Sequence, residues 1–402
     1  MSRSNTAARY GSVAKTFHWL TALLIVSALA VGYFAHQAPY EDSAQLAFKA
    51  TLFSLHKTIG LTAFLVAVLR ILWAFTQPRP KLLNGDHKLE ALAAETAHWV
   101  LYGAMVLVPL TGWMHHAATT GFAPIWWPFG QSLFFIPKDP VLAETLGALH
   151  YVFMLLLVLT LLAHIGGALK HAIIDKDKTL QRMLPGTPDL PDTPAQQPGH
   201  TLPFLGAATV WAAALYVGAF SGIFAPAEGA EPAAELAEVA SEWQVQSGTL
   251  GIAVQQFGSE VTGSFADWTA EIAFDETATD GKHGTVTVTI AIGSLTLGSV
   301  TDQALGADYL NASEHPTAAF TADLLAAEAG YIAEGTLALS GHEVPTTLPF
   351  TLTLDGDSAE MSGALELDRR SFHVGDTMTD ESSLGFGVAV TVNLTAKRGE
   401  QS

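Results

Sequence analysis

The hydrophobic pattern of the chain changes near residue 225. Before that point apolar residues form five unbroken blocks, and after it apolar and polar residues alternate in short runs. A bilayer core of about 30 Å is crossed by about 20 helical residues, and each block is about that long. We therefore predict an all-α transmembrane four-helix bundle plus a fifth transmembrane helix, at residues 16–35, 56–75, 95–114, 148–169 and 203–224.

Lys and Arg fall in alternate connections between these helices. They gather before the first helix, between the second and third, and after the fourth, whereas the other two connections each contain one Lys, Lys49 or Lys138. An excess of Lys and Arg marks the cytoplasmic side of a membrane. We therefore predict a multi-pass membrane protein with a cytoplasmic N-terminus. Its fifth helix would then deliver the C-terminal part to the periplasm.

From Trp243 onward the pattern is that of β-strands. Residues 285–292, 335–339 and 350–354 alternate strictly between apolar and polar, which is typical of strands buried on one face. Gly and Asp clusters at 280–281, 341 and 355–357 indicate hairpin connections. We predict an all-β antiparallel, lipocalin-like barrel with one short helix near residues 302–310. A closed barrel can enclose a ligand.

Linkers of biased composition separate these parts. Residues 186–202 are rich in proline and are predicted as a cytoplasmic linker, and residues 225–240 are rich in Ala, Glu and Pro. The predicted domains are therefore 10–185, 203–224 and 241–397. Small residues just after the fifth helix leave open a signal-peptidase cut there, although the short charged region that begins such signals is missing.

The composition agrees with this division and narrows the function. Only 14% of the residues are charged, against about 25% in soluble globular domains. Residues 1–225 carry 14 Lys+Arg and 11 Asp+Glu, a net of +3, whereas residues 226–402 carry 5 and 27, a net of −22. So acidic a domain excludes nucleic-acid binding through bulk charge. The absence of Cys excludes disulfides, Cys-ligated clusters and covalently attached haem.

Four histidines lie at matched depths in the predicted helices. His18 and His164 lie near the cytoplasmic side, and His56 and His150 near the outer side. His150 and His164 are 14 residues apart, close to four helical turns, so they face the same way with a rise of about 21 Å. Histidine at hydrocarbon depth is costly and indicates function, and imidazole suits iron. We interpret the two pairs as ligands of two non-covalent haem b groups, one near each membrane face.

Other readings of these residues remain open. A single membrane histidine often serves helix packing, although four at pairwise equal depth are difficult to explain that way. His98 has no matched partner. His171 lies seven residues after His164 on the same face and is the main rival for the inner ligand. Arg70, Lys170 and His171 are candidates for contacting the haem propionates, with snorkelling to the interface as the alternative for Arg70 and Lys170.

Several short motifs of the membrane part resemble the prokaryotic di-haem cytochrome b561 family over residues 10–185. They are Phe-His-Trp-Leu at 17–20, His-Lys-Thr-Ile-Gly at 56–60, Pro-Leu-Thr-Gly-Trp at 109–113, Leu-His at 149–150, Ala-His at 163–164, and the tail 168–185. The resemblance implies bis-histidine ligation by His18 with His164 and by His56 with His150. It also implies electron transfer in the membrane, commonly with a quinone as one partner.

The loop at residues 121–137 is unusually aromatic. Such a loop can anchor the protein at the lipid headgroups. Alternatively, it can wall a site for a quinone or a small electron donor beside the outer haem.

The C-terminal part resembles the YceI-like family, a lipocalin-type barrel that binds long polyisoprenoid chains. The matching segments lie at 261–268, 309–311, 315–320, 335–341 and 369–375, within 241–397. We find no catalytic triad or metal-ligand spacing in this part. Candidates for lining an isoprenoid cavity, with ordinary barrel core as the alternative for each, are Phe265, Trp268, Phe274, Phe320 and Phe372.

Together these features and resemblances predict a di-haem b-type cytochrome of the bacterial inner membrane, which is an electron-transfer protein or, as an enzyme, a quinone-linked oxidoreductase. It would pass electrons between a quinone and a periplasmic-side partner, and its barrel would hold an isoprenoid, such as the tail of that quinone. Three alternatives stay open. They are an oxidoreductase for superoxide or another small reductant with an incidental barrel, a non-redox lipid-binding protein with a membrane anchor, and a membrane subunit of a separate dehydrogenase.

Overall fold

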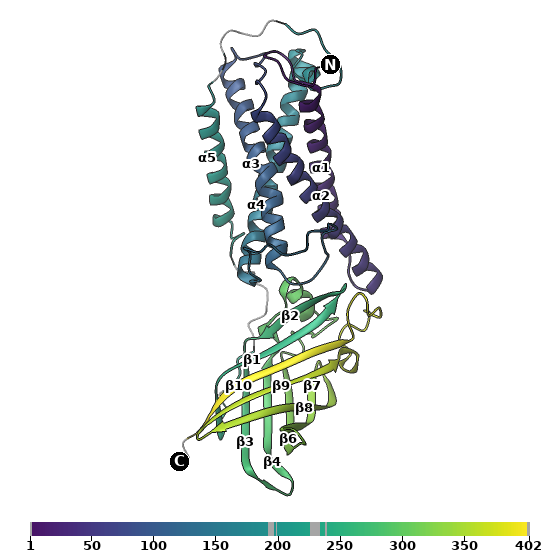
Figure 1. The fold of residues 1–402 in the computed structure, drawn as a ribbon, viewed down its shortest axis with the longest axis vertical. Coiled ribbons are helices and arrows are strands. Elements are labelled where there is room, and N and C mark those ends of the chain that lie inside the picture. Colours follow the sequence, from purple (N-terminus) through teal and green to yellow (C-terminus); the bar gives the residue numbers. More distant parts are fainter. Residues whose placement is uncertain (1, 192–196, 198, 226–233, 238, 400–402) are drawn as a thin grey trace. The chain divides into compact units, whose positions relative to one another are not determined.

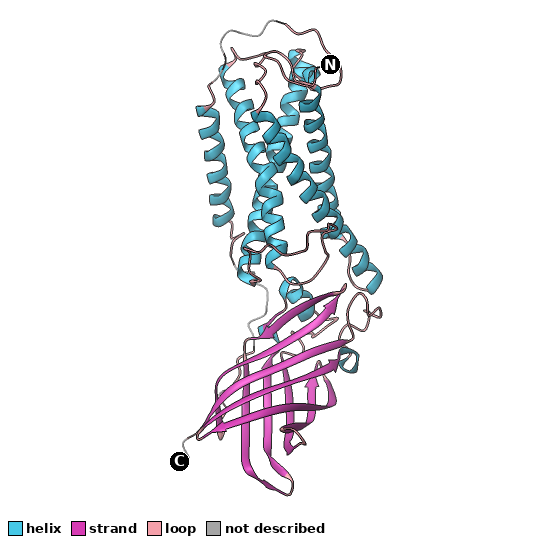
Figure 2. Ribbon diagram, in the orientation of Figure 1, coloured by secondary structure: helices cyan, strands magenta, loops and turns pink. Residues whose placement is uncertain are grey.

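The computed structural model describes residues 2–191, 197, 199–225, 234–237 and 239–399. Its contacts divide the chain into two compact units, one mainly helical and one mainly of β-strands, and each is described by itself (Figures 1 and 2). Parts of both predicted linkers, and the residues around the suggested cut after the fifth helix, lie outside the described residues.

The helical unit confirms the five predicted spans. All five helices are long and apolar enough to cross a membrane. α2, α3 and α4 begin 13, 7 and 8 residues before the predicted hydrophobic spans, because hydropathy detects only the lipid-facing length of a helix that continues into polar surroundings. The helices are α1 (Ser12–Gln37), α2 (Ser43–Phe75), α3 (Lys88–Ala118), α4 (Pro140–Lys170) and α5 (Thr201–Phe220).

Local sequence sets both ends of α4. Asp139 caps its start by accepting a 2.8 Å hydrogen bond from the backbone N–H of Leu142, and Pro140 occupies the first turn, where its missing N–H costs nothing. At its end the helix widens into a π-turn (His171–Asp175). Lys176 then adopts a left-handed conformation with φ 54° and stops it.

The helices pack unevenly. The backbones of α3 and α4 run close together, and their shared core contains Ala104, Val108, Phe153 and Leu157. α5 lies on the same two helices, with the Trp211 ring against Phe153 at 5.0 Å between centroids. The backbones of α1 and α2, by contrast, approach the other helices at few points. The contacts of α1 and α2 with the α3–α4 pair are therefore made mainly by side chains.

The β unit is one antiparallel ten-stranded sheet, in the order β3-β4-β6-β7-β8-β9-β10-β1-β2-β5. The predicted strands at 335–339 and 350–354 lie within β7 and β8, and the one at 285–292 overlaps β4, which ends at residue 291. The short helix predicted near 302–310 is α6 (Thr301–Leu305), which ends five residues earlier. The strands are β1 (Trp243–Gln256), β2 (Ser259–Phe265), β3 (Trp268–Thr279), β4 (Lys282–Ala291), β5 (Leu295–Thr296), β6 (Thr317–Ala326), β7 (Tyr331–Leu339), β8 (His342–Asp355), β9 (Ser358–Asp368) and β10 (Gly387–Arg398).

Tight turns set the register of this sheet. The hairpins β3–β4 and β7–β8 are closed by two-residue loops, Asp280-Gly281 and Ser340-Gly341, in which both residues have positive φ. This geometry matches the twist of antiparallel strands and favours Gly at the second position. The Asp-Gly and Gly signals in the sequence therefore placed both turns correctly.

The sheet curls until its first strand, β3, lies beside the start of β1. Ser241 bridges the two, since its Oγ accepts a 2.8 Å bond from the Ile272 N–H, and the Trp243 indole donates to the Phe274 carbonyl at 3.3 Å. The ladder itself remains open, with β3 and β5 at its two ends. Inward side chains from nearly all strands form the main core cluster, which surrounds the interior of the barrel.

Candidate functional site

The structure brings the four predicted histidines together in the two predicted pairs. The rings of His56 (α2) and His150 (α4) are 6.3 Å apart between centroids, and those of His18 (α1) and His164 (α4) are 6.2 Å apart. Two imidazoles bound to one metal on opposite sides need about 6 Å between centroids, given metal–nitrogen bonds of about 2 Å. Both pairs therefore leave room for one iron atom between their rings.

Hydrogen bonds also hold His56 and His150 in the tautomer that suits metal binding. His56 Nδ1 is 2.9 Å from the Ala28 carbonyl oxygen, and His150 Nδ1 is 2.8 Å from the Val108 carbonyl oxygen. A carbonyl can only accept, so each Nδ1 must carry the proton and donate it. The lone pair then resides on Nε2, so a carbonyl that accepts from Nδ1 leaves Nε2 free to bind a metal.

Glycines make this arrangement possible. Gly32 lies one turn after Ala28, and Gly112 lies one turn after Val108. A Cβ on Gly32 would lie 2.7 Å from His56 Nδ1, and a Cβ on Gly112 would lie 2.9 Å from His150 Nδ1. Each imidazole thus rests in a notch that any larger residue would fill.

His115 on α3 uses the same device. Its Nδ1 donates to the Ala143 carbonyl at 2.7 Å, and a Cβ on Gly147, one turn later, would lie 3.3 Å from that nitrogen. Sequence reasoning missed this glycine notch in all three places. A carbonyl and a glycine four residues apart can be seen in a sequence, but the histidine that uses them comes from another helix.

The inner pair has a neighbour that the sequence did not predict. His98 on α3, expected to be unmatched, lies 5.3 Å from the His164 ring in an edge-to-face contact. That separation is about 1 Å short of the distance that a shared metal requires, so this contact fits ring packing better than ligation. His98 also lies near Glu95, with 3.8 Å between Nδ1 and Oε1.

The rival inner ligand is held by carboxylates. His171 Nδ1 lies 2.6 Å from Asp177 Oδ2 and 3.2 Å from Asp175 Oδ2. The Lys170 ammonium likewise bonds Glu90 at 2.9 Å and Asp175 at 2.8 Å. Both bases are thus paired within this cluster, which favours His164 over His171 as the ligand.

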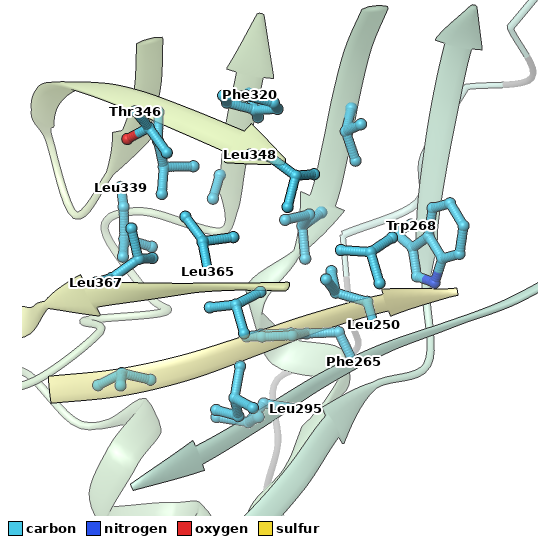
Figure 3. Close-up of a pocket in the computed structure, with 18 of the residues that line it drawn as sticks. Leu250, Phe265, Trp268, Leu295, Phe320, Leu339, Thr346, Leu348, Leu365 and Leu367 are labelled. Atoms are coloured by element: carbon cyan, nitrogen blue, oxygen red, sulfur yellow. The ribbon is translucent and has the colours of Figure 1, made fainter. Parts of the chain in front are cut away.

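The concave face of the curled sheet lines a cavity of about 310 Å³ (Figure 3). Its wall is almost wholly apolar, and its volume is at the lower end of the range of about 300–1,000 Å³ for small-molecule pockets. The five aromatic residues predicted to line a cavity all lie along this wall: Phe265, Trp268, Phe274, Phe320 and Phe372.

Comparisons with known proteins follow the same division. A model of the prokaryotic cytochrome b561 family matches residues 9–186, and a model of the YceI-like domain matches residues 242–397. Cytochrome b561 homolog 2 of Escherichia coli is 33% identical over 188 residues, 46% of this chain and 95% of the relative. The probable superoxide oxidase CybB of Yersinia pestis is 24% identical over 178 residues, 44% of this chain and 96% of the relative.

The chain belongs to the cytochrome b561 family. Its C-terminal part is a YceI-like domain. Among solved structures, BcnA of Burkholderia cenocepacia is 26% identical and covers 37% of this chain and 96% of its own, with a TM-score of 0.35.

Membership of the cytochrome b561 family implies b-type haem, and the bundle fits that group. The spacing of both histidine pairs suits iron, and α1 and α2 stand away from their neighbours. A Cβ on Gly60, one turn after His56, would meet nothing within 4 Å. Open space beside a candidate ligand is what a flat macrocycle needs.

Arg70 fits a contact with haem propionates better than the two other candidates do. Its guanidinium approaches the Met105 sulfur at 3.7 Å and lies over the Tyr102 ring at 5.8 Å. In the part of the chain that the structure describes, no carboxylate forms an ion pair with it. The described residues engage this guanidinium in one hydrogen bond, to the Met105 sulfur, so its other N–H groups suit an anionic group, whereas Lys170 and His171 already contact carboxylates.

In this cytochrome b561, the aromatic loop packs against the middle of α2 and the C-terminal part of α3. The Trp127 ring contacts Trp113 at 5.1 Å and Phe129 at 5.2 Å, and the Trp126 N–H donates to Thr58 Oγ1 at 3.0 Å. Phe129 and Phe134 are strongly exposed, which suits a headgroup anchor. Trp127 faces the helices, so the loop can also wall a site there.

Proposed function

We propose that this protein is a di-haem membrane cytochrome that transfers electrons between a quinone and a periplasmic-side partner. The observation that carries the proposal is the pair of 6.2–6.3 Å histidine separations at two levels of one bundle. In this proposal His18 with His164 holds one haem, and His56 with His150 holds the other.

The protein's own residues give each site its properties. The Ala28 and Val108 carbonyls orient the outer imidazoles, and the apolar helices exclude water. Arg70 neutralises negative charge at the inner site. Bound haem supplies a one-electron couple, whose potential depends on the axial ligands, burial and nearby charge.

We further propose that the N-terminus is cytoplasmic and that the barrel lies in the periplasm. The distribution of Lys and Arg between the loops supports this orientation. The outer histidine pair would then lie toward the side on which the barrel is held.

The proposed role of the barrel is to hold an isoprenoid, such as the tail of the quinone that exchanges electrons with the bundle. Its apolar cavity supports a hydrocarbon chain as ligand. Lipid extraction from the purified full chain, followed by mass spectrometry, tests this role. A prenyl compound should be enriched over the variant Ala333→Trp, which fills the cavity, and equal amounts from both proteins would contradict the proposal.

The haem-to-protein ratio tests the bundle. His18→Ala and His164→Ala should each lose the same haem, and His56→Ala and His150→Ala the other, as seen in the absorbance and redox titration of the purified protein. His171→Ala should keep both. Loss of the inner haem in His171→Ala but not in His164→Ala would overturn the inner pairing.

A second candidate is oxidation of superoxide at the outer side. The observation in its favour is the similarity of the bundle to a probable superoxide oxidase. Stopped-flow mixing of the oxidised protein with superoxide distinguishes the two candidates. Rapid reduction of the haems would favour this role, and reduction only by quinol would favour the first.

A further inference from the structure

We propose that the barrel cavity selects a prenyl lipid with a neutral, hydroxyl-bearing head group and rejects phosphorylated or carboxylated ones. This inference rests on the proposed role of the barrel in holding an isoprenoid. Three polar features of the cavity wall carry it: a buried amide oxygen without a partner, a tyrosine hydroxyl with a proton to donate, and an arginine with no donor left.

The amide belongs to Gln256, the last residue of β1. Its side chain faces the interior with Leu250 and Val254, and only 4% of the residue is exposed. Its Oε1 has no hydrogen-bond partner. A buried polar atom left unpaired costs about 1–3 kcal/mol, so a ligand that donates to it is favoured.

The hydroxyl belongs to Tyr309, which follows α6. It accepts a 2.8 Å hydrogen bond from Gln303 Nε2, and both residues line the cavity. Since it already accepts this bond, its own proton can be donated to an oxygen of a ligand. Burial raises the pKa of this phenol above its ordinary value, which keeps that proton in place.

Arg369 is the one charged residue among the described residues along the wall, and it is only 4% exposed. Its guanidinium donates to five backbone carbonyls, those of Val374, Gly375, Met378, Leu384 and Gly385. A guanidinium has five N–H donors, so every one is used. An anionic head group would therefore have to break an existing bond to reach this cation.

These features lie at one end of the barrel. The Gln255 carbonyl accepts from the Gly385 N–H at 2.7 Å, and the Gly385 carbonyl accepts from Arg369. A Cβ on Gly375 would lie within 3.2 Å of both Arg369 Nη1 and the Tyr309 ring. The polar groups thus form one corner of an otherwise apolar cavity.

The corner complements a hydroxyl and opposes an anion. A hydroxyl can donate to Gln256 Oε1 and can also accept from Tyr309, because it is both a donor and an acceptor. A phosphate or carboxylate has to shed its hydration, which is costly without new donors. Sites built around particular hydrogen bonds discriminate strongly between such head groups.

The test compares three C20 probes on the full chain in detergent: geranylgeraniol, geranylgeranyl phosphate and the hydrocarbon phytane. Native mass spectrometry measures retention of each lipid, and the variant Ala333→Trp, with its cavity filled, defines binding outside the barrel. We expect geranylgeraniol to bind at least about tenfold more tightly than the phosphate. Gln256→Leu should weaken the alcohol about fivefold to tenfold and leave phytane unchanged.

Two further variants keep the test decisive. Tyr309→Phe, which removes only a hydroxyl, should also weaken the alcohol. Thr346→Val is the matched control, because Thr346 lines the cavity but its hydroxyl already donates to the Val344 carbonyl. Equal or tighter binding of the phosphate, or an alcohol affinity unmoved in both Gln256→Leu and Tyr309→Phe, would overturn the inference while prenyl binding stood. No barrel-specific binding of any probe would instead refute the proposed role of the barrel.

Discussion

At the scale of single residues, the bundle depends on where side chains are absent. Gly32 and Gly112 leave notches for the rings of His56 and His150, and the carbonyl one turn earlier accepts from each Nδ1. A histidine that binds a metal must hold its ring orientation. The absence of a Cβ at these two glycines is therefore part of what positions the rings.

We predict that Gly112→Ala displaces the His150 ring and removes or weakens the outer haem. The new Cβ would lie 2.9 Å from two ring atoms, closer than packed atoms approach. Haem content should fall toward half, or the spectrum of one haem should become high-spin. Absorbance and electron paramagnetic resonance of the purified protein measure this. Gly166→Ala is the control, because its Cβ would meet nothing within 4 Å; equal spectra for both variants would contradict the prediction.

Arg70 offers a second test at this scale. If its guanidinium neutralises the inner site, Arg70→Gln should lower the inner midpoint potential, because the ferric form carries more positive charge. An interaction of about 1.4 kcal/mol corresponds to about 60 mV for one electron. Potentiometric titration measures the shift. Arg79→Gln, at an exposed arginine over the Trp99 ring, should move neither potential by more than about 20 mV, and an unchanged inner potential in Arg70→Gln would exclude the proposed role.

At the scale of elements, the sequence predicted which helices and strands are present better than it predicted the contacts between them. The five spans, the alternating strands and the turns at Asp280-Gly281 and Gly341 were visible because hydropathy, period and turn chemistry are local. The matched depths of the four histidines also followed from helix geometry. The contact between His98 and His164 did not, because it depends on how α3 is rotated against α4. The sequence also did not predict that every N–H group of the Arg369 guanidinium donates to a carbonyl, because the accepting carbonyls lie in an irregular loop.

That loop gives a stability prediction. Arg369 ties residues 374–385 to the barrel through five carbonyls, so Arg369→Leu should destabilise the barrel by about 2–4 kcal/mol. For a domain of this size, this corresponds to roughly 5–15 °C in Tm. Differential scanning fluorimetry of the full chain measures the shift.

Arg370→Leu is the matched control for this prediction. Arg370 is adjacent but exposed; it pairs with Asp368 at the surface, an interaction worth at most about 1 kcal/mol, and lies over the Phe386 ring at 4.0 Å. An equal loss of stability in the two variants would show that the network of carbonyls contributes little.

At the scale of the whole molecule, α4 links the two histidine pairs. One rigid helix carries His150 and His164, 14 residues apart, and meets α1 at one level and α2 at the other. An insertion of one residue between them would turn one histidine by about 100° relative to the other. The spacing between the two sites is therefore set by one helix rather than by the loops.

α5 has a different relation to the rest of the bundle. It contains no histidine, and it rests on α3 and α4 through close contacts such as Trp211 with Gly103 and Gly218 with Val152. Lipid tails are as apolar as the residues they would replace here. A chain ending at residue 186 should therefore still bind both haems with unchanged spectra, and loss of either haem on truncation would contradict this.

If so, the fifth helix is a module that can be added to the bundle without changing the two histidine sites. A cytochrome can acquire a new domain through such a helix while its histidine sites stay unchanged, because the added helix packs against α3 and α4. Evolution or protein engineering could then exchange the domain that follows α5 and keep the four-helix bundle intact.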